Sequence, residues 1–179
     1  MFRASSNGEI WTSAPSEVHA AQRFALVRVP PKGLSGAIVL SEEVLGTEIH
    51  FWGGRSMPCS RADCKACLEG ISARWYGWLW ILAEKGGMIS IVEITAAAAE
   101  QTRAYVEQQG SLRGARFAAQ RLPAKPNGRM TLFLRPSHYD AAKLPTPGSL
   151  ITALERMWNA TSHRQGGERT DELAPRNQA

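Results

Sequence analysis

The sequence has 179 residues, of which 44% are hydrophobic and 21% are charged, a balance typical of a globular protein and incompatible with disorder over the whole chain. Its most apolar stretch, residues 75–83, is about half the length that a helix needs to cross a bilayer, and the N-terminal residues lack the apolar centre of a secretory signal, so we expect a soluble cytoplasmic protein with no membrane partner. The formal net charge of +5 favours a polyanionic partner.

The N-terminal half is expected to form strands. Residues 1–20 are polar and lack periodicity, which predicts a flexible arm. Short runs rich in β-branched and aromatic residues then predict strands over 24–29, 36–40 and 47–52. The clearest signal is a hairpin, because two β-rich runs, 74–83 and 88–95, flank a Lys-Gly-Gly turn.

A helix is predicted directly after this hairpin. Thr95 can serve as its N-cap, and Gly110 is placed where a glycine ends a helix. Two further strands are expected over 114–122 and 129–134, joined by a loop that contains the turn dipeptide Asn127-Gly128.

The C-terminal residues complete the architecture. Apolar residues on one face predict a last helix over 149–159, and residues 161–179 are polar enough to predict a disordered tail. The order of elements predicts a mainly β (α+β) fold, a small Greek-key barrel of the OB type with one helix before the last strand pair and a C-terminal helix. We expect one domain over residues 21–160, with a zinc knuckle inserted at 50–68.

All three cysteines lie within nine residues, as Cys59, Cys64 and Cys67, and His50 precedes them. An odd number of cysteines without a secretory signal argues against a disulfide framework. The spacing C-x4-C-x2-C with a nearby histidine suits tetrahedral Zn²⁺ held as Cys3His. In a loop too short to build a core, such a zinc is structural.

Other interpretations of the cluster stay open. The cysteines could lie together by chance and remain reduced, although their polar neighbours disfavour this, since free cysteine prefers apolar surroundings. Asp63 and His138 are the fallback ligands if His50 is not the fourth. An iron–sulfur site of the plant type needs a fourth cysteine, which the sequence lacks. The common catalytic motifs are absent too, so we expect no enzymatic activity, with a zinc hydrolase or nuclease as a weaker alternative.

One predicted strand carries a row of aromatic side chains. Alternate residues of an extended strand share a face, which places Tyr76, Trp78 and Trp80 together. Such rings can stack unpaired bases. Alternatively, the row packs in the core beneath a helix.

A second row combines arginines with an aromatic ring. Arg129, Phe133 and Arg135 share one face of their strand, and supply guanidinium groups for phosphates and a ring for a base. The alternative is a solvated edge strand. Residues 113–135 contain no acidic residue and six basic ones: Arg113, Arg116, Arg121, Lys125, Arg129 and Arg135. We expect the first three of these arginines to extend the surface.

These features together resemble the single-stranded-DNA-binding proteins of the T-even phages, over about residues 24–136. The ligand order is similar, with His50 before three cysteines that end in C-x2-C, although the gaps between ligands are longer in that family. The resemblance implies an OB-type barrel with a zinc subdomain and a basic, aromatic cleft for single strands. That family usually ends in an acidic tail, whereas residues 170–179 here are of mixed charge. Residues 50–79 also look like a segment of uncharacterised bacterial proteins.

The sequence therefore predicts non-catalytic binding of single-stranded nucleic acid, with single-stranded DNA as the first choice, and a structural Zn²⁺. The wider setting we expect is a protein complex of replication, recombination or mobile elements. The alternative is a protein–protein adaptor subunit of a larger nucleoprotein complex, which would present the zinc loop and the helix that carries Trp158.

Overall fold

The computed structural model describes residues 24–125 and 128–163. The predicted arm, 1–20, and residues 164–179 of the predicted tail lie outside the described residues, whereas residues 161–163 belong to the last helix. The strands are β1 (Ala25–Arg28), β2 (Leu34–Val39), β3 (Leu45–Trp52), β4 (Arg55–Pro58), β5 (Arg74–Ala83), β6 (Ile89–Thr95), β7 (Arg116–Leu122) and β8 (Arg129–Arg135). The helical elements are η2 (Arg61–Asp63), α1 (Lys65–Leu68), α2 (Ala96–Gln109), η3 (Ala141–Lys143) and α3 (Leu150–His163).

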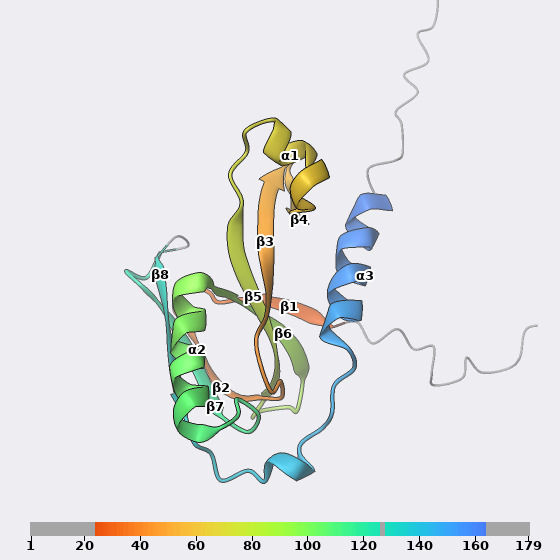
Figure 1. The fold of residues 1–179 in the computed structure, drawn as a ribbon. Coiled ribbons are helices and arrows are strands. Elements are labelled where there is room, and N and C mark those ends of the chain that lie inside the picture. The colour runs from red at the N-terminus through yellow and green to blue at the C-terminus, as the bar shows by residue number, and fades with distance from the viewer. Residues whose placement is uncertain (1–23, 126–127, 164–179) are drawn as a thin grey trace, which may run out of the picture.

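The strands form one open, mixed sheet (Figure 1). Its order is β1-β6-β5-β2-β7-β8, with β3 on β5 and β4 on β3, and only the β1–β6 pair is parallel among the described strands. The mainly β (α+β) class is confirmed, as are the helix before the last strand pair and the C-terminal helix. Closure into an OB-type barrel is not observed, because no pairing in the described part of the chain joins β1 to β8.

Strand β5 pairs with two different strands along one edge. Its second half pairs with β2 and its first half with β3. The indole of Trp75 lies against the cross-strand pair Gly46 and Gly77, and a Cβ at Gly46 would come within 1.9 Å of the Trp75 ring. Strands β3 and β4 extend beyond the rest of the sheet (Figure 1).

The predicted hairpin and the predicted helix after it are confirmed. β5 and β6 pair from Tyr76–Thr95 to Leu82–Ile89. α2 begins after Thr95 and ends at Gly110, whose φ of 84° is the left-handed conformation that favours glycine.

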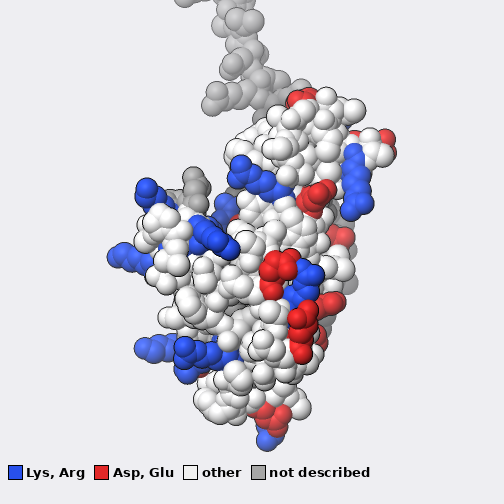
Figure 2. All heavy atoms as spheres, turned by 60° about the vertical axis from the view of Figure 1, so that its left-hand side comes forward, with Lys and Arg blue, Asp and Glu red and all other residues white. Residues whose placement is uncertain are grey.

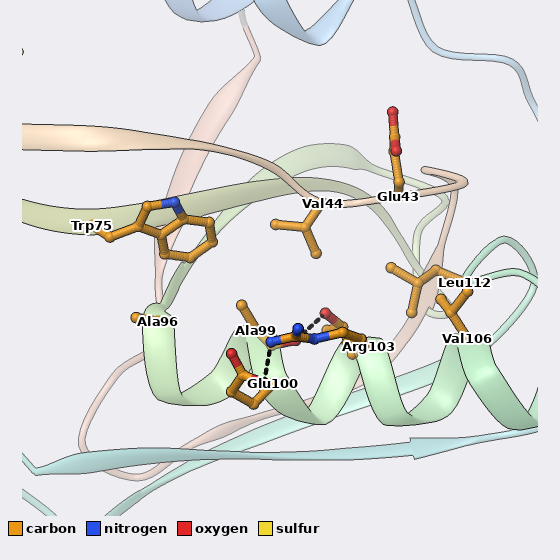
Figure 3. Close-up of a pocket in the computed structure, with 10 residues that line it drawn as sticks. Glu43, Val44, Trp75, Ala96, Ala99, Glu100, Arg103, Val106 and Leu112 are labelled. Atoms are coloured by element: carbon orange, nitrogen blue, oxygen red, sulfur yellow. Dashed lines mark hydrogen bonds and ion pairs between the residues drawn. The ribbon is translucent and has the colours of Figure 1, made fainter.

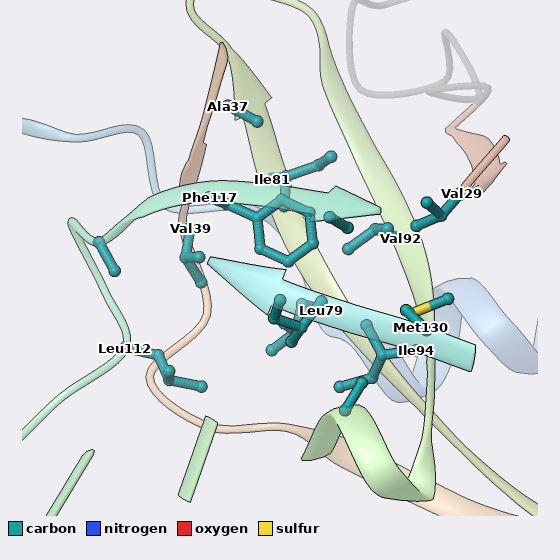
Figure 4. Packing of buried hydrophobic residues seen from close by; sticks show 14 residues of the cluster. Val29, Ala37, Val39, Leu79, Ile81, Val92, Ile94, Leu112, Phe117 and Met130 are labelled. Atoms are coloured by element: carbon teal, nitrogen blue, oxygen red, sulfur yellow. The ribbon is translucent and has the colours of Figure 1, made fainter. Parts of the chain in front are cut away.

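Helices cover both faces of the sheet. On one face, α2 covers a cluster that includes Val39, Leu79 and Phe117 (Figure 4). On the other face, Leu154 of α3 packs near Trp80 in a second cluster. None of the helices in the described ranges combines the length and apolarity needed to cross a membrane.

Two phenylalanines on neighbouring strands test this division into core and surface. Phe117 of β7 is fully buried, whereas Phe133 of β8 is 45% exposed. We expect Phe117→Ala to lower the free energy of unfolding by about 3–5 kcal/mol, and Phe133→Ala by less than about 1 kcal/mol. Urea denaturation of the two variants measures both values, and equal losses would contradict the observed packing.

Candidate functional site

The hairpin of β3 and β4 brings the histidine close to the first cysteine. Gly53 and Gly54 have φ values of 57° and 75°, as a tight two-residue turn requires. The turn pairs His50 with Met57 of β4, and the backbone N–H of Cys59 donates to the carbonyl of Glu48 at 2.8 Å. The two glycines therefore reverse the chain between β3 and β4.

A single helical turn presents the other two cysteines. The carbonyl of Cys64 accepts a hydrogen bond from the N–H of Leu68 at 3.0 Å, which places Cys64 at the start of α1 and Cys67 within it. After the helix, Glu69 accepts a hydrogen bond of 2.5 Å from the indole of Trp52, which ties the helix to β3.

The four side chains form one cluster. One ligand atom from each of His50, Cys59, Cys64 and Cys67 lies within 4.8 Å of all the others. The sulfurs of Cys59 and Cys67 are 3.5 Å apart, and the Cys67 sulfur is 3.3 Å from Nε2 of His50. Zn–S and Zn–N bonds of about 2.3 and 2.0 Å give tetrahedron edges of roughly 3.8 and 3.5 Å. The group fits a tetrahedral metal ion, and the fallback ligands Asp63 and His138 are not part of it.

The surroundings of the sulfurs shift the pKa values of Cys64 and Cys67 in opposite directions. The backbone N–H of Cys67 donates to the Cys64 sulfur and lowers the pKa of that thiol to about 6, although burial alone would raise it. Hydrogen bonding with Cys59, followed by burial, raises the pKa of Cys67 to about 12. The cluster thus favours one thiolate and opposes a second, as expected where a cation supplies the missing positive charge.

Residues 50–73, which we call the cysteine lobe, have almost no apolar core. Only His50, Cys64 and Ala66 are buried in this segment. Phe51 and Leu68 are 71% and 80% exposed. Two of the three buried residues are thus candidate metal ligands, so the cluster takes the place of a hydrophobic core.

The aromatic row shares one face as predicted, but it is largely covered. Trp78 and Trp80 are each 2% exposed. Trp158 of α3 stands edge-on to Trp78, at 5.6 Å between ring centroids, and the indole of Trp80 donates to the carbonyl of Gly148 at 3.1 Å. Both rings are therefore unavailable for base stacking in this structure, because α3 covers them; Tyr76 is half-buried.

Two of the predicted nucleic-acid-binding arginines instead hold the fold together. Arg113 donates to the carbonyls of Leu40 and Leu144 at 2.6 and 2.7 Å. Arg121 donates to the carbonyl of Val29 at 2.8 Å. Because these guanidinium groups satisfy backbone carbonyls, they are not free for phosphate contacts.

The remaining predicted residues lie together on the exposed side of the β7–β8 hairpin. Arg116 pairs with Glu84 at 3.0 Å and lies opposite Arg135. Arg129 and Arg135 are exposed, and no side-chain partner for either occurs within the described ranges. With Phe133 they form what we call the outer face of the hairpin. Figure 2 shows Lys and Arg side chains projecting over this hairpin on the left, with most Asp and Glu side chains to their right.

Two of the grooves beside the sheet are lined by the helices or the cysteine lobe. The first, of about 540 Å³, lies between α2 and the segment before β3; its wall includes Val44, Trp75 and Leu112, and Arg103 pairs with Glu100 at its edge (Figure 3). The second, of about 780 Å³, lies between the cysteine lobe, the sheet and α3. Neither groove was predicted, because each is lined by segments that are distant along the chain.

Comparison with known proteins found no family model, no curated protein and no solved structure that matches the chain. The resemblance to the phage proteins therefore stays a prediction.

Metal analysis of purified variants tests the ligand set. We expect one metal ion per chain in the unaltered protein, and a loss of most of it in Cys64→Ser and His50→Ala, because three ligands hold the ion less tightly than four. Asp63→Ala is the matched control and should keep the metal, since Asp63 lies outside the cluster. Full metal content in His50→Ala, or loss in Asp63→Ala, would contradict this assignment.

Proposed function

We propose that this protein binds single-stranded nucleic acid without catalysis, and that Zn²⁺ in the Cys3His cluster is its structural ion. The observation that carries the proposal is the outer face of the β7–β8 hairpin, where an exposed ring lies on the same strand face as two exposed arginines. Single-stranded DNA is the first choice of ligand, within a nucleoprotein complex of replication, recombination or mobile elements.

The spacing along β8 supports this choice. Arg129, Phe133 and Arg135 occupy alternate positions of one strand, so their side chains leave the same side of the sheet. Phe133 is paired with Ala118 of β7, whose small side chain leaves one side of the ring open. An unpaired base stacked on such a ring contributes about 1–3 kcal/mol, and the arginines can contact the phosphates on either side.

The identity of the ion follows from the donor set. Three thiolates and one imidazole in a tetrahedral arrangement are typical ligands of structural Zn²⁺. Three free cysteines also fit a reducing compartment such as the cytoplasm.

A labelled oligonucleotide of about twenty nucleotides tests the binding surface by fluorescence anisotropy. We expect Phe133→Ala to weaken binding about 5- to 150-fold, the equivalent of one lost stacking contact. Arg129→Ala should reduce the slope of log affinity against log salt by about 0.7, because one phosphate contact is lost.

Lys143→Glu is the control, because Lys143 is exposed on η3 and outside the outer face; it should leave the affinity almost unchanged. Tighter binding of double-stranded than of single-stranded probe, or equal losses in Lys143→Glu and Arg129→Ala, would contradict the proposal.

The second candidate function is a protein–protein adaptor. It is favoured by the cysteine lobe, on which Phe51 and Leu68 expose large apolar side chains, since exposed apolar groups are common at interaction surfaces. An adaptor would co-purify with a protein through this lobe and would bind free oligonucleotides weakly at every salt concentration.

A further inference from the structure

The groove between the cysteine lobe, the sheet and α3 has a volume of about 780 Å³. It shares no residue with the outer face of the β7–β8 hairpin. Its lining includes three arginines, Arg28, Arg55 and Arg74, and one acidic residue, Glu93. The groove therefore carries a net positive charge and suits an anionic ligand.

The sheet surface that lines the groove offers a hydrogen-bond donor and an acceptor side by side. Trp78 of β5 and Glu93 of β6 are directly paired across the strands. The indole Nε1 of Trp78 is buried, and no hydrogen-bond acceptor for it occurs among the described residues. A buried donor without an acceptor is costly and uncommon, so an acceptor atom on a ligand would relieve this cost.

Glu93 provides the complementary acceptor. Its side chain is 16% exposed, and one carboxylate oxygen lies 3.5 Å from Nε of Arg28. Burial raises the pKa of this carboxyl, and the positive charges of Arg28 and Arg121 oppose the rise. A ligand group that donates a hydrogen bond to the carboxylate would offset part of the cost of burying it.

Aromatic rings form the walls above this surface. Tyr76 is two residues before Trp78 on β5 and shares its face of the strand. Phe51 comes from the cysteine lobe, and Trp158 comes from α3. Flat rings of this kind pack well against a planar ligand. A ligand that fits all three features is planar, has a hydrogen-bonding edge with an acceptor beside a donor, and carries an anionic group.

We propose that this groove binds a nucleoside monophosphate. The base lies between the aromatic walls with its edge towards Trp78 and Glu93, and the phosphate lies among the arginines. An acceptor and a donor on neighbouring positions of the base meet the indole N–H and the carboxylate, respectively. Because Trp158 stands edge-on to Trp78, its ring has to turn as the base enters, and Tyr76 and Phe51 are the walls that stay in place.

Isothermal titration of the metal-loaded full chain with AMP, GMP, CMP and UMP tests the proposal, with the four nucleosides and inorganic phosphate as separate probes. At least one nucleotide is expected to bind at least tenfold more tightly than its nucleoside and than phosphate. Arg74→Ala should weaken that binding at least fivefold, because Arg74 is an exposed cation of the groove. Glu93→Gln should weaken it at least fivefold by altering the acceptor for the base edge.

Lys143→Ala is the control, since Lys143 is exposed on η3 and lies outside both the groove and the outer face of the hairpin; it should leave nucleotide affinity unchanged. Thermal melting of each variant establishes that it is folded. Failure of all four nucleotides to bind, phosphate binding as tight as nucleotide binding, or equal losses in Lys143→Ala and Arg74→Ala would overturn the proposal. Loss of oligonucleotide binding in Arg129→Ala with nucleotide binding retained would uphold both assignments separately.

Discussion

The cluster of His50, Cys59, Cys64 and Cys67 is the constraint on which the cysteine lobe depends. The lobe extends beyond the sheet on β3 and β4 (Figure 1), and it buries almost no apolar side chain of its own. Burial of apolar surface normally offsets the conformational entropy lost on folding. A segment of this length without such burial needs a cross-link, and four side chains placed to hold one metal ion can supply it.

The lobe in turn shapes the rest of the surface. Strand β5 carries β3 on its first half and the main sheet on its second half, so the position of the lobe is fixed relative to the sheet. Phe51, Arg55 and Arg74 project from or beside the lobe into the wall of the groove. The outer face of the β7–β8 hairpin belongs to the other end of the sheet order. Two independent surfaces of positive charge thus result from one fold.

Local patterns in the sequence were sufficient for most elements and for the candidate metal site. The Gly-containing turn between β5 and β6, the glycine that ends α2 and the cysteine spacing each act over a few residues, which a single sequence reports well. β4 was missed, because Arg55–Pro58 is short and follows two glycines. The burial of Trp78 and Trp80 was not predictable, because the helix that covers them, α3, comes from a distant part of the chain. Similarly, no local signal indicates that Arg113 and Arg121 are bound by backbone carbonyls of other elements.

Native-state amide hydrogen exchange, with and without a chelator, tests most directly whether the ion rather than packing holds the lobe. Removal of the metal is expected to abolish protection in residues 50–73, while Leu79, Val92 and Phe117, which are fully buried in the main sheet, keep theirs. Equal protection of the lobe in both states would show that it folds without the ion and would contradict the account.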